Sequence, residues 1–241
     1  MLFNSIEFAI FLPLVFIVYW HIVNNNINLQ NIFIIFSSYI FYGCWNWRFL
    51  SLIIISSATD YIIGQAIYKS NCISRKKQLL LISVFINLGI LSVFKYYNFF
   101  LESFAGIFSL FNFSLDVRPL TIILPIGISF YTFQTLSYTF DIYKGNCKPT
   151  ENIFSFFAFV SFFPQLVAGP IERAQNLLPQ FYSKRVFNYK LAVDGCRQIL
   201  LGFFKKVVIA DNCAVHVNYI FDNYNILDGS TLLLGAFYFA F

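Results

Sequence analysis

Charged residues are scarce in this 241-residue chain. Only 11% of its residues are Asp, Glu, Lys or Arg, whereas 59% are hydrophobic. A soluble domain needs more polar surface than this to remain in water. The composition therefore excludes an ordinary soluble domain and predicts an integral membrane protein.

Paired cysteines and the short motifs of common catalytic sites are missing as well. The five cysteines are odd in number and scattered, with no C-x-x-C pair and no histidine at metal-ligand spacing, so neither a disulfide framework nor a zinc site is indicated. No G-x-S-x-G, H-E-x-x-H or phosphate-binding glycine loop occurs. His21 and His216 have no carboxylate or nucleophile at useful spacing, so we expect neither to be catalytic.

The basic residues are distributed as in a membrane protein. The formal net charge is +5, but Lys and Arg fall in short clusters between apolar runs. This pattern follows the positive-inside rule for cytoplasmic loops. We therefore expect the lipid bilayer as a partner, and no nucleic acid.

Long apolar runs make up most of the chain. Each is near the ~20 residues that a helix needs to cross ~30 Å of hydrocarbon, and no soluble domain fits between them. No basic residue precedes the first run and no cleavage site follows it, so it is not a signal peptide and should remain in the membrane. The sequence predicts an all-α, polytopic helical bundle, with runs at 8–23, 31–47, 50–68, 78–94, 121–143 and 153–171.

Basic loops predict how the bundle is oriented. Lys69 and the cluster Arg75–Lys77 follow the third run, which places that loop in the cytoplasm. Counting crossings from there puts the N-terminus outside and returns the run 121–143 to the cytoplasm. If 153–171 then crossed once, the basic segment that follows it would lie outside, against the rule.

Helix-breaking residues at the end of the last run suggest a path of the chain that agrees with the positive-inside rule. Pro164 and Pro170 lack backbone donors, and Gly169 permits a sharp turn. A re-entrant hairpin would keep the next segment in the cytoplasm, provided that protein or a watery cavity satisfies the freed backbone groups. The alternative is a kinked helix that spans the membrane.

A polar stripe is predicted on the helix before this run. If residues 127–143 are helical, one face carries polar side chains that either line a pathway or join helices by hydrogen bonds. Asp60, in the third run, is expected to be buried with a polar partner that the sequence does not identify. The stripe consists of Gln134, Ser137, Tyr138 and Asp141.

Two further stretches carry candidate site residues. Gln165, with Glu172 and Arg173 beside it, could hold an anionic or acyl-carrier ligand; alternatively, the two charged residues form a boundary ion pair. Lys205 and Lys206 stand among apolar residues in "GFFKKVVIADN". Their ammonium groups would lie among lipid headgroups or contact the phosphate of a nucleotide-bearing donor.

The last apolar stretch, 231–241, rises only ~16 Å as a helix. It would leave a terminal carboxylate near the middle of the membrane, at a cost of a few kcal/mol. We therefore expect the chain to be the N-terminal part of a longer protein.

Four blocks in this order resemble the membrane-bound O-acyltransferases. They are "MLFNSIEFAIFLPLVFIVYW", "LPIGISFYTFQTLSYTFDIYKG", "FFPQLVAGPIER" and "GFFKKVVIADN". The resemblance covers essentially the whole chain as one domain, and is closest to the bacterial subgroup that O-acetylates alginate and other exported polysaccharides. It implies an acyl donor such as acetyl-CoA on the cytoplasmic side, a polysaccharide acceptor and an extracytoplasmic acetyltransferase as a further partner.

The resemblance also implies a catalytic histidine that follows a Trp downstream of the last block. Neither histidine of this chain matches that motif, so no catalytic residue is assigned. Residues 164, 165, 169, 170 and 173 would shape a re-entrant wall of the acyl passage. A transporter is the competing interpretation, because broken helices also build transport sites, and an inactive gene remnant is a third.

Overall fold

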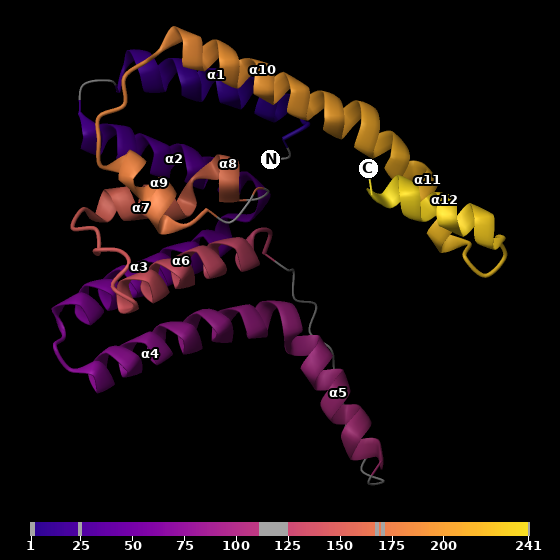
Figure 1. Cartoon of the computed structure of the whole chain (residues 1–241), viewed down its shortest axis with the longest axis horizontal. Coiled ribbons are helices and arrows are strands. Elements are labelled where there is room, and N and C mark those ends of the chain that lie inside the picture. The colour runs from indigo at the N-terminus through magenta and orange to yellow at the C-terminus, as the bar shows by residue number, and fades with distance from the viewer. Residues whose placement is uncertain (1–2, 24–25, 111–124, 167–168, 170–171, 241) are drawn as a thin grey trace. The chain divides into compact units, whose positions relative to one another are not determined.

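Helices are the only regular elements in the described part of the chain. The computed structural model describes residues 3–23, 26–110, 125–166, 169 and 172–240, and these contain α-helices, short 3-10 turns and π-turns (Figure 1). The predicted all-α fold is confirmed. Residues 121–124, 167–168 and 170–171 of the predicted runs, which include Pro170, lie outside the described residues.

The chain divides into two compact units. The first comprises residues 15–185, and the second combines the N-terminal residues up to Leu14 with those from Val186 onward. Helix α1 (Ile6–His21) contributes to both. The first unit contains the predicted polar stripe and the helix-breaking residues.

The helices of the first unit follow the predicted apolar runs closely up to the last one. They are α2 (Ile27–Asn46), the 3-10 turn η1 (Trp47–Phe49), α3 (Leu50–Lys69), α4 (Ile73–Leu91), the π-turn η2 (Ser92–Tyr96), α5 (Tyr97–Leu110) and α6 (Ile128–Tyr143). The run 153–171 is instead broken into α7 (Ile153–Ser161) and α8 (Phe163–Leu166), which α9 (Ala174–Leu177) and the 3-10 turn η3 (Leu178–Phe181) follow.

Local sequence explains where several of these helices begin and end. The Asn26 and Asn152 side chains accept hydrogen bonds from the first backbone N–H groups of α2 and α7. Helix α6 lies between two glycines with left-handed backbones, Gly127 at φ 77° and Gly145 at φ 78°. Because only glycine adopts this region at no steric cost, the two residues fix both ends of α6.

The core of the first unit lies where α3, α4 and α6 pack side by side (Figure 1). Its apolar part includes Ile53 and Ile67, which are fully buried. Gly64 allows α3 to approach α6 closely, since a Cβ there would lie 2.9 Å from both Tyr138 Cε1 and Ile142 Cδ1. The middle of this three-helix contact is polar, however, and contains Asp60.

The outward faces of the helices are strongly apolar. Phe85 is 81% exposed and Ile62 is 64% exposed, which suits contact with lipid rather than water. By length and composition, two helical stretches can cross a membrane: Ile27–Lys69, which includes α2 and α3, and Ile73–Ala105, which includes α4. Together with the composition, these stretches identify a helical membrane protein.

The second unit is dominated by one long helix with a π-turn inside it. Helix α10 (Tyr189–Phe203) continues through the π-turn η4 (Phe204–Ala210) into α11 (Asp211–Asp222), and α12 (Gly229–Ala240) packs against α11. Gly235 of α12 lies against Ile220, where an added Cβ would come within 2.7 Å of Ile220 Cγ2. A helix was expected at the motif "GFFKKVVIADN", and the structure places the motif within this long helix.

The close contact at Gly64 makes a testable prediction. Gly64→Ala should destabilise the protein by about 1–3 kcal/mol, because the new methyl group overpacks the buried contact with Tyr138. Gly89→Ala is the matched control, since a Cβ at Gly89 of α4 meets nothing within 4 Å, and alanine is a better helix former by ~1 kcal/mol. Thermal unfolding of both variants in detergent measures the effect, and equal midpoints would contradict the packing described.

Candidate functional site

The break between α7 and α8 is the feature around which the candidate site is built. Phe162 leaves the helical region, with φ −53° and ψ 106°, and so ends α7 after nine residues. A nine-residue helix rises about 13 Å, less than half of the hydrocarbon thickness. Pro164 lies in the first turn of α8, where its missing N–H removes no helical hydrogen bond.

A helix break frees backbone groups that must find partners elsewhere. The Gln134 side chain of α6 donates from Nε2 to the carbonyl of Phe159, near the end of α7, at 3.0 Å. The backbone N–H of Phe163, at the start of α8, donates to Ser38 Oγ of α2 at 3.1 Å. Side chains from two neighbouring helices, α6 and α2, therefore each form a hydrogen bond with one backbone group beside the break.

Helix α2 supports a second irregular segment in the same way. Tyr42, one turn after Ser38, donates its hydroxyl to the carbonyl of Ile126 in the turn before α6, at 2.9 Å. Phe41 lies between these two residues in sequence and packs its ring against Phe163, with centroids 5.5 Å apart. Consecutive turns of α2 thus hold both the break and the start of α6.

The predicted stripe on α6 divides into a buried and a half-exposed pair. Gln134 and Tyr138 are buried, and the Tyr138 hydroxyl accepts a hydrogen bond from the backbone N–H of Thr150 at 3.2 Å. Ser137 and Asp141 are partly exposed, and Ser137 donates to the carbonyl of Gln134. The structure thus brings Gln134 together with α7 and Tyr138 together with the loop after α6.

The candidates around the break differ in exposure. Gln165 of α8 is buried, Pro164 is exposed, and Arg173 is an exposed residue at the start of α9. Gly169 has φ 158°, and the atom nearest to an added Cβ would be 3.7 Å away, so the available space does not itself require glycine. Glu172 is half-buried, and no ion pair joins it to Arg173 among the described residues.

Arg185 joins several parts of the first unit, although its sequence context did not mark it as a candidate. Its guanidinium donates from Nη2 to Asn31 Oδ1 of α2 at 2.7 Å and stacks over the rings of Phe181 and Tyr19, at 5.3 and 5.8 Å from their centroids. Gln30 exchanges two hydrogen bonds with the Arg185 backbone, at 2.9 and 3.1 Å. These contacts fasten the chain to α2 where the first unit ends.

The environment of Arg185 is polar but offers no carboxylate among the described residues. Burial lowers the pKa of its guanidinium, and the neighbouring Tyr19 partly opposes this shift. Asn31 also donates from Nδ2 to Ser155 Oγ and to the carbonyl of Phe181, each at 3.0 Å. The sequence signal for this contact was a polar pair, Gln30 and Asn31, in the first turns of α2.

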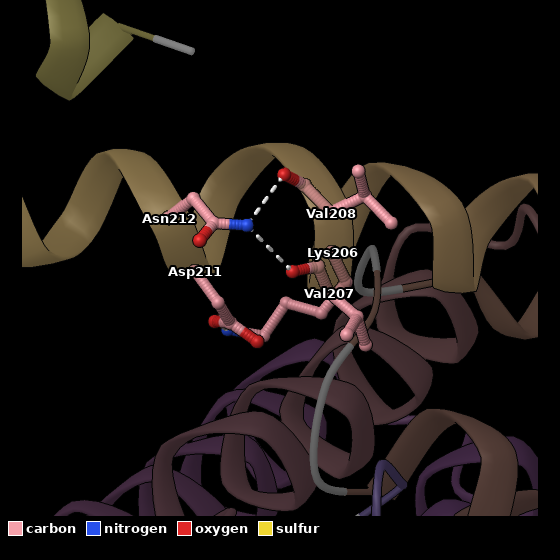
Figure 2. A network of polar contacts seen from close by, with 5 residues as sticks. All are labelled: Lys206, Val207, Val208, Asp211 and Asn212. Carbon is pink, nitrogen blue, oxygen red and sulfur yellow. Dashed lines mark hydrogen bonds and ion pairs between the residues drawn. The ribbon is translucent and has the colours of Figure 1, made fainter.

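The two lysines of the π-turn have different surroundings. Figure 2 shows that Lys206 pairs with Asp211, five residues on, while the Asn212 side chain reaches back to the carbonyls of Val207 and Val208. Residues five apart meet because a π-turn holds more residues per turn than an α-helix. No hydrogen bond or ion pair of Lys205 is found in the described part of the chain, so Lys206 alone of the two lysines has a charged partner there.

An apolar pocket of about 360 Å³ lies beside the π-turn in the second unit. Phe203 and Val207 line one side of it, and residues near the N-terminus, including Phe8 and Leu12, line the other. Within the described residues, no three His, Cys, Asp or Glu side chains come together. The candidate site at the helix break is a different feature: a wall of polar groups, including Gln134 and Ser38, that form hydrogen bonds with the backbone of α7 and α8.

Curated relatives match most of this chain. Probable alginate O-acetylase AlgI of Pseudomonas putida is 38% identical over 206 residues, covering 85% of this chain and 42% of the relative. The AlgI protein of Azotobacter vinelandii is 36% identical and covers 92% and 44% of the two chains, respectively. The peptidoglycan O-acetyltransferase of Helicobacter pylori is 32% identical and covers 92% and 47%. No family model and no solved structure matches.

These relatives define the class of the protein. They are membrane-bound O-acyltransferases, and the chain belongs with that family over the region that it shares with them. The resemblance predicted from the four sequence blocks is confirmed. The chain spans somewhat less than half the length of these relatives.

Arg185 and Arg173 allow a matched comparison. Arg185→Ala should destabilise the protein by about 1–3 kcal/mol, because Asn31 Oδ1 loses a charged donor and two rings lose their stacking partner. Arg173→Ala, at an exposed position, should change stability by less than about 0.5 kcal/mol. Arg185→Lys should restore only part of the loss, since lysine lacks the planar fork. Thermal unfolding compares all three, and similar midpoints for the two alanine variants would contradict this assignment.

Proposed function

We propose that the protein takes part in the O-acetylation of an exported polysaccharide, as a multi-pass protein of the bacterial plasma membrane. The observation that carries the proposal is the helix break, held by Gln134 and Ser38, in a chain whose relatives are named as alginate and peptidoglycan O-acetyltransferases. An irregular backbone at membrane depth is tolerated where it is enclosed by protein or lines a cavity. Such a wall is what an acyl passage requires.

The wall has two tasks in this proposal. Its hydrogen bonds hold the broken backbone in one conformation, so that the passage keeps its shape. Its apolar surroundings, which include the buried Phe156 and Phe159 of α7, keep water away from an acyl group that would otherwise be hydrolysed. Gln165, buried on α8, is the polar side chain that we place along the passage.

The reactants are assigned by chemistry. An activated acyl donor, such as acetyl-CoA, would deliver the acetyl group from the cytoplasmic side, and a hydroxyl of the polysaccharide would accept it. An extracytoplasmic acetyltransferase is a further proposed partner. Lys205, exposed in the π-turn, is available to contact a phosphate of the donor, whereas Lys206 is engaged by Asp211.

Substitution of Gln165 tests the proposal. In the complete reading frame of the gene, expressed in an acetylation-deficient host, Gln165→Leu should lower polymer-bound acetate about tenfold per unit of membrane protein, equivalent to ~1.4 kcal/mol in the barrier. Gln198→Leu is the matched control, because Gln198 is an exposed glutamine of α10 bonded to Asp194. A fall in acetate that only follows a fall in protein level would reduce Gln165 to a structural role.

The path of the chain through the membrane can be tested independently of activity. We expect Ser74, in the first turn of α4, and Ser183, after η3, to face the cytoplasm, since both lie in basic segments. Single-cysteine variants at these positions, in a background in which the five native cysteines are replaced, can be labelled with a membrane-impermeant reagent from either side. Labelling of the two positions from opposite sides would rule out a re-entrant course for α7 and α8.

A further inference from the structure

Asp60 is buried at the centre of the first unit without a cationic partner. It lies in the middle of α3, inside a stretch able to cross a membrane, and its residue exposure is 0%. Its carboxylate accepts hydrogen bonds from Ser83 Oγ at 2.5 Å and from Asn87 Nδ2 at 2.7 Å, both of α4. No Lys, Arg or His makes an ion pair with it among the described residues. A lone charge at this depth costs several kcal/mol unless another charge offsets it.

The side chains around Asp60 supply oxygen atoms from three helices. Ser56 of α3 donates to Asn87 Oδ1 at 2.6 Å, and Thr135 and Thr139 of α6 complete the cluster. Every one of these residues is buried, with at most 1% exposure. Hydroxyl, amide and carboxylate oxygens are the ligands that hard cations prefer. We call this set the Asp60 cluster: Ser56, Asp60, Ser83, Asn87, Thr135 and Thr139.

The hydrogens of the two threonines can point away from the cluster centre. Thr135 donates to the carbonyl of Thr132 at 3.2 Å, and Thr139 donates to the carbonyl of Leu136 at 3.0 Å, both within α6. Their hydroxyl lone pairs then face Ser56 and Ser83. Ser56, Ser83 and Asn87 donate hydrogen bonds within the cluster. The lone pairs of the two threonine hydroxyls are then available to a cation.

Two distances in the cluster fit ligands that share an ion better than they fit hydrogen bonds. Ser56 Oγ and Thr135 Oγ1 are 3.4 Å apart, and Ser83 Oγ and Thr139 Oγ1 are 3.3 Å apart. Hydroxyl pairs in good hydrogen bonds stand about 2.7–2.8 Å apart. Oxygens that bind one hard cation at about 2.3–2.6 Å stand roughly 3.3–3.7 Å apart when they are neighbours in an octahedral shell.

Ser57 provides an independent sign that a partner is missing here. It lies three residues before Asp60 on the same buried face of α3 and is 1% exposed. Its Oγ is buried and has no hydrogen-bond partner among the described residues. Buried hydroxyls are rarely left in this state unless a water or an ion takes the place of a protein partner.

We propose that the Asp60 cluster binds a single monovalent metal cation, and that this cation is Na⁺. One carboxylate and one monovalent cation leave a neutral site, whereas a divalent ion would bury a net positive charge inside the bundle. The bound ion draws together side chains of α3, α4 and α6. The stability of the bundle therefore depends on the Na⁺ concentration, separately from any acyl-transfer activity.

The test measures thermal unfolding of the purified chain in detergent at constant ionic strength. With Na⁺ in place of choline, the midpoint should rise by on the order of 5 °C, saturating with Na⁺ concentration. Ca²⁺ should not replace Na⁺. Asp60→Asn should abolish the response, while Asp141→Asn, at the half-exposed end of α6, should keep it.

A milder variant keeps the test decisive if Asp60→Asn fails to fold. Thr135→Val preserves volume and removes one ligand oxygen, so it should raise the half-saturating Na⁺ concentration about tenfold, or ~1.4 kcal/mol of binding. The proposal is overturned if the midpoint is the same in Na⁺ and choline. It is also overturned if Asp60→Asn retains the Na⁺ response, or if the midpoint follows pH alone, which would mean that a proton neutralises Asp60.

Discussion

Backbone polar groups released inside an apolar bundle are the constraint on which this structure depends. A helix that stops at Ser161 and restarts at Phe163 exposes carbonyls and N–H groups where no water competes for them. Gln134 and Ser38 take up one group on each side of the break. The positions of α2 and α6 are thus tied to the position of the break, because each group left unsatisfied would cost ~1–3 kcal/mol.

The same constraint explains why α2 is polar along one face. Asn31, Ser38 and Tyr42 bind, in order, the chain around Phe181, the start of α8 and the turn before α6. A purely apolar helix of equal length would pack as well but would satisfy none of these groups. The polar side chains of α2 therefore specify which parts of the chain it contacts, while its apolar side chains supply most of the burial.

Composition and periodicity predict the class of the fold and most helix positions, because runs of apolar residues report directly on membrane-crossing helices. The runs 31–47 and 50–68 match α2 and α3 within a few residues. Gly127 and Gly145 mark the ends of α6 because both have left-handed backbones, which glycine adopts at no steric cost. The orientation inferred from the basic loops stays a prediction.

Partners that are distant in sequence could not be predicted from the pattern. The bond between Gln134 and the carbonyl of Phe159 crosses 25 residues, and that between Gln30 and Arg185 crosses 155. Arg185 belonged to a basic segment that the charge rule interpreted as a solvated loop, and only its position in space shows that it is half-buried. Asp60 was expected to have a buried polar partner, and the structure identifies Ser83 and Asn87.

The π-turn at Phe204–Ala210 has a consequence for how this helix tolerates changes in length. A π-turn accommodates one residue more than an α-helical turn, so the loss of any one residue there can be absorbed by a return to α-helix. Because a π-turn advances the helix by less rotation per residue than an α-helix does, such a loss would leave α11 facing nearly the same way relative to α10. If the lost residue lay between Lys206 and Asp211, the two would be four residues apart, a spacing at which side chains also meet on an α-helix. The π-turn therefore allows the segment to lose one residue while α10 and α11 keep their rotational phase.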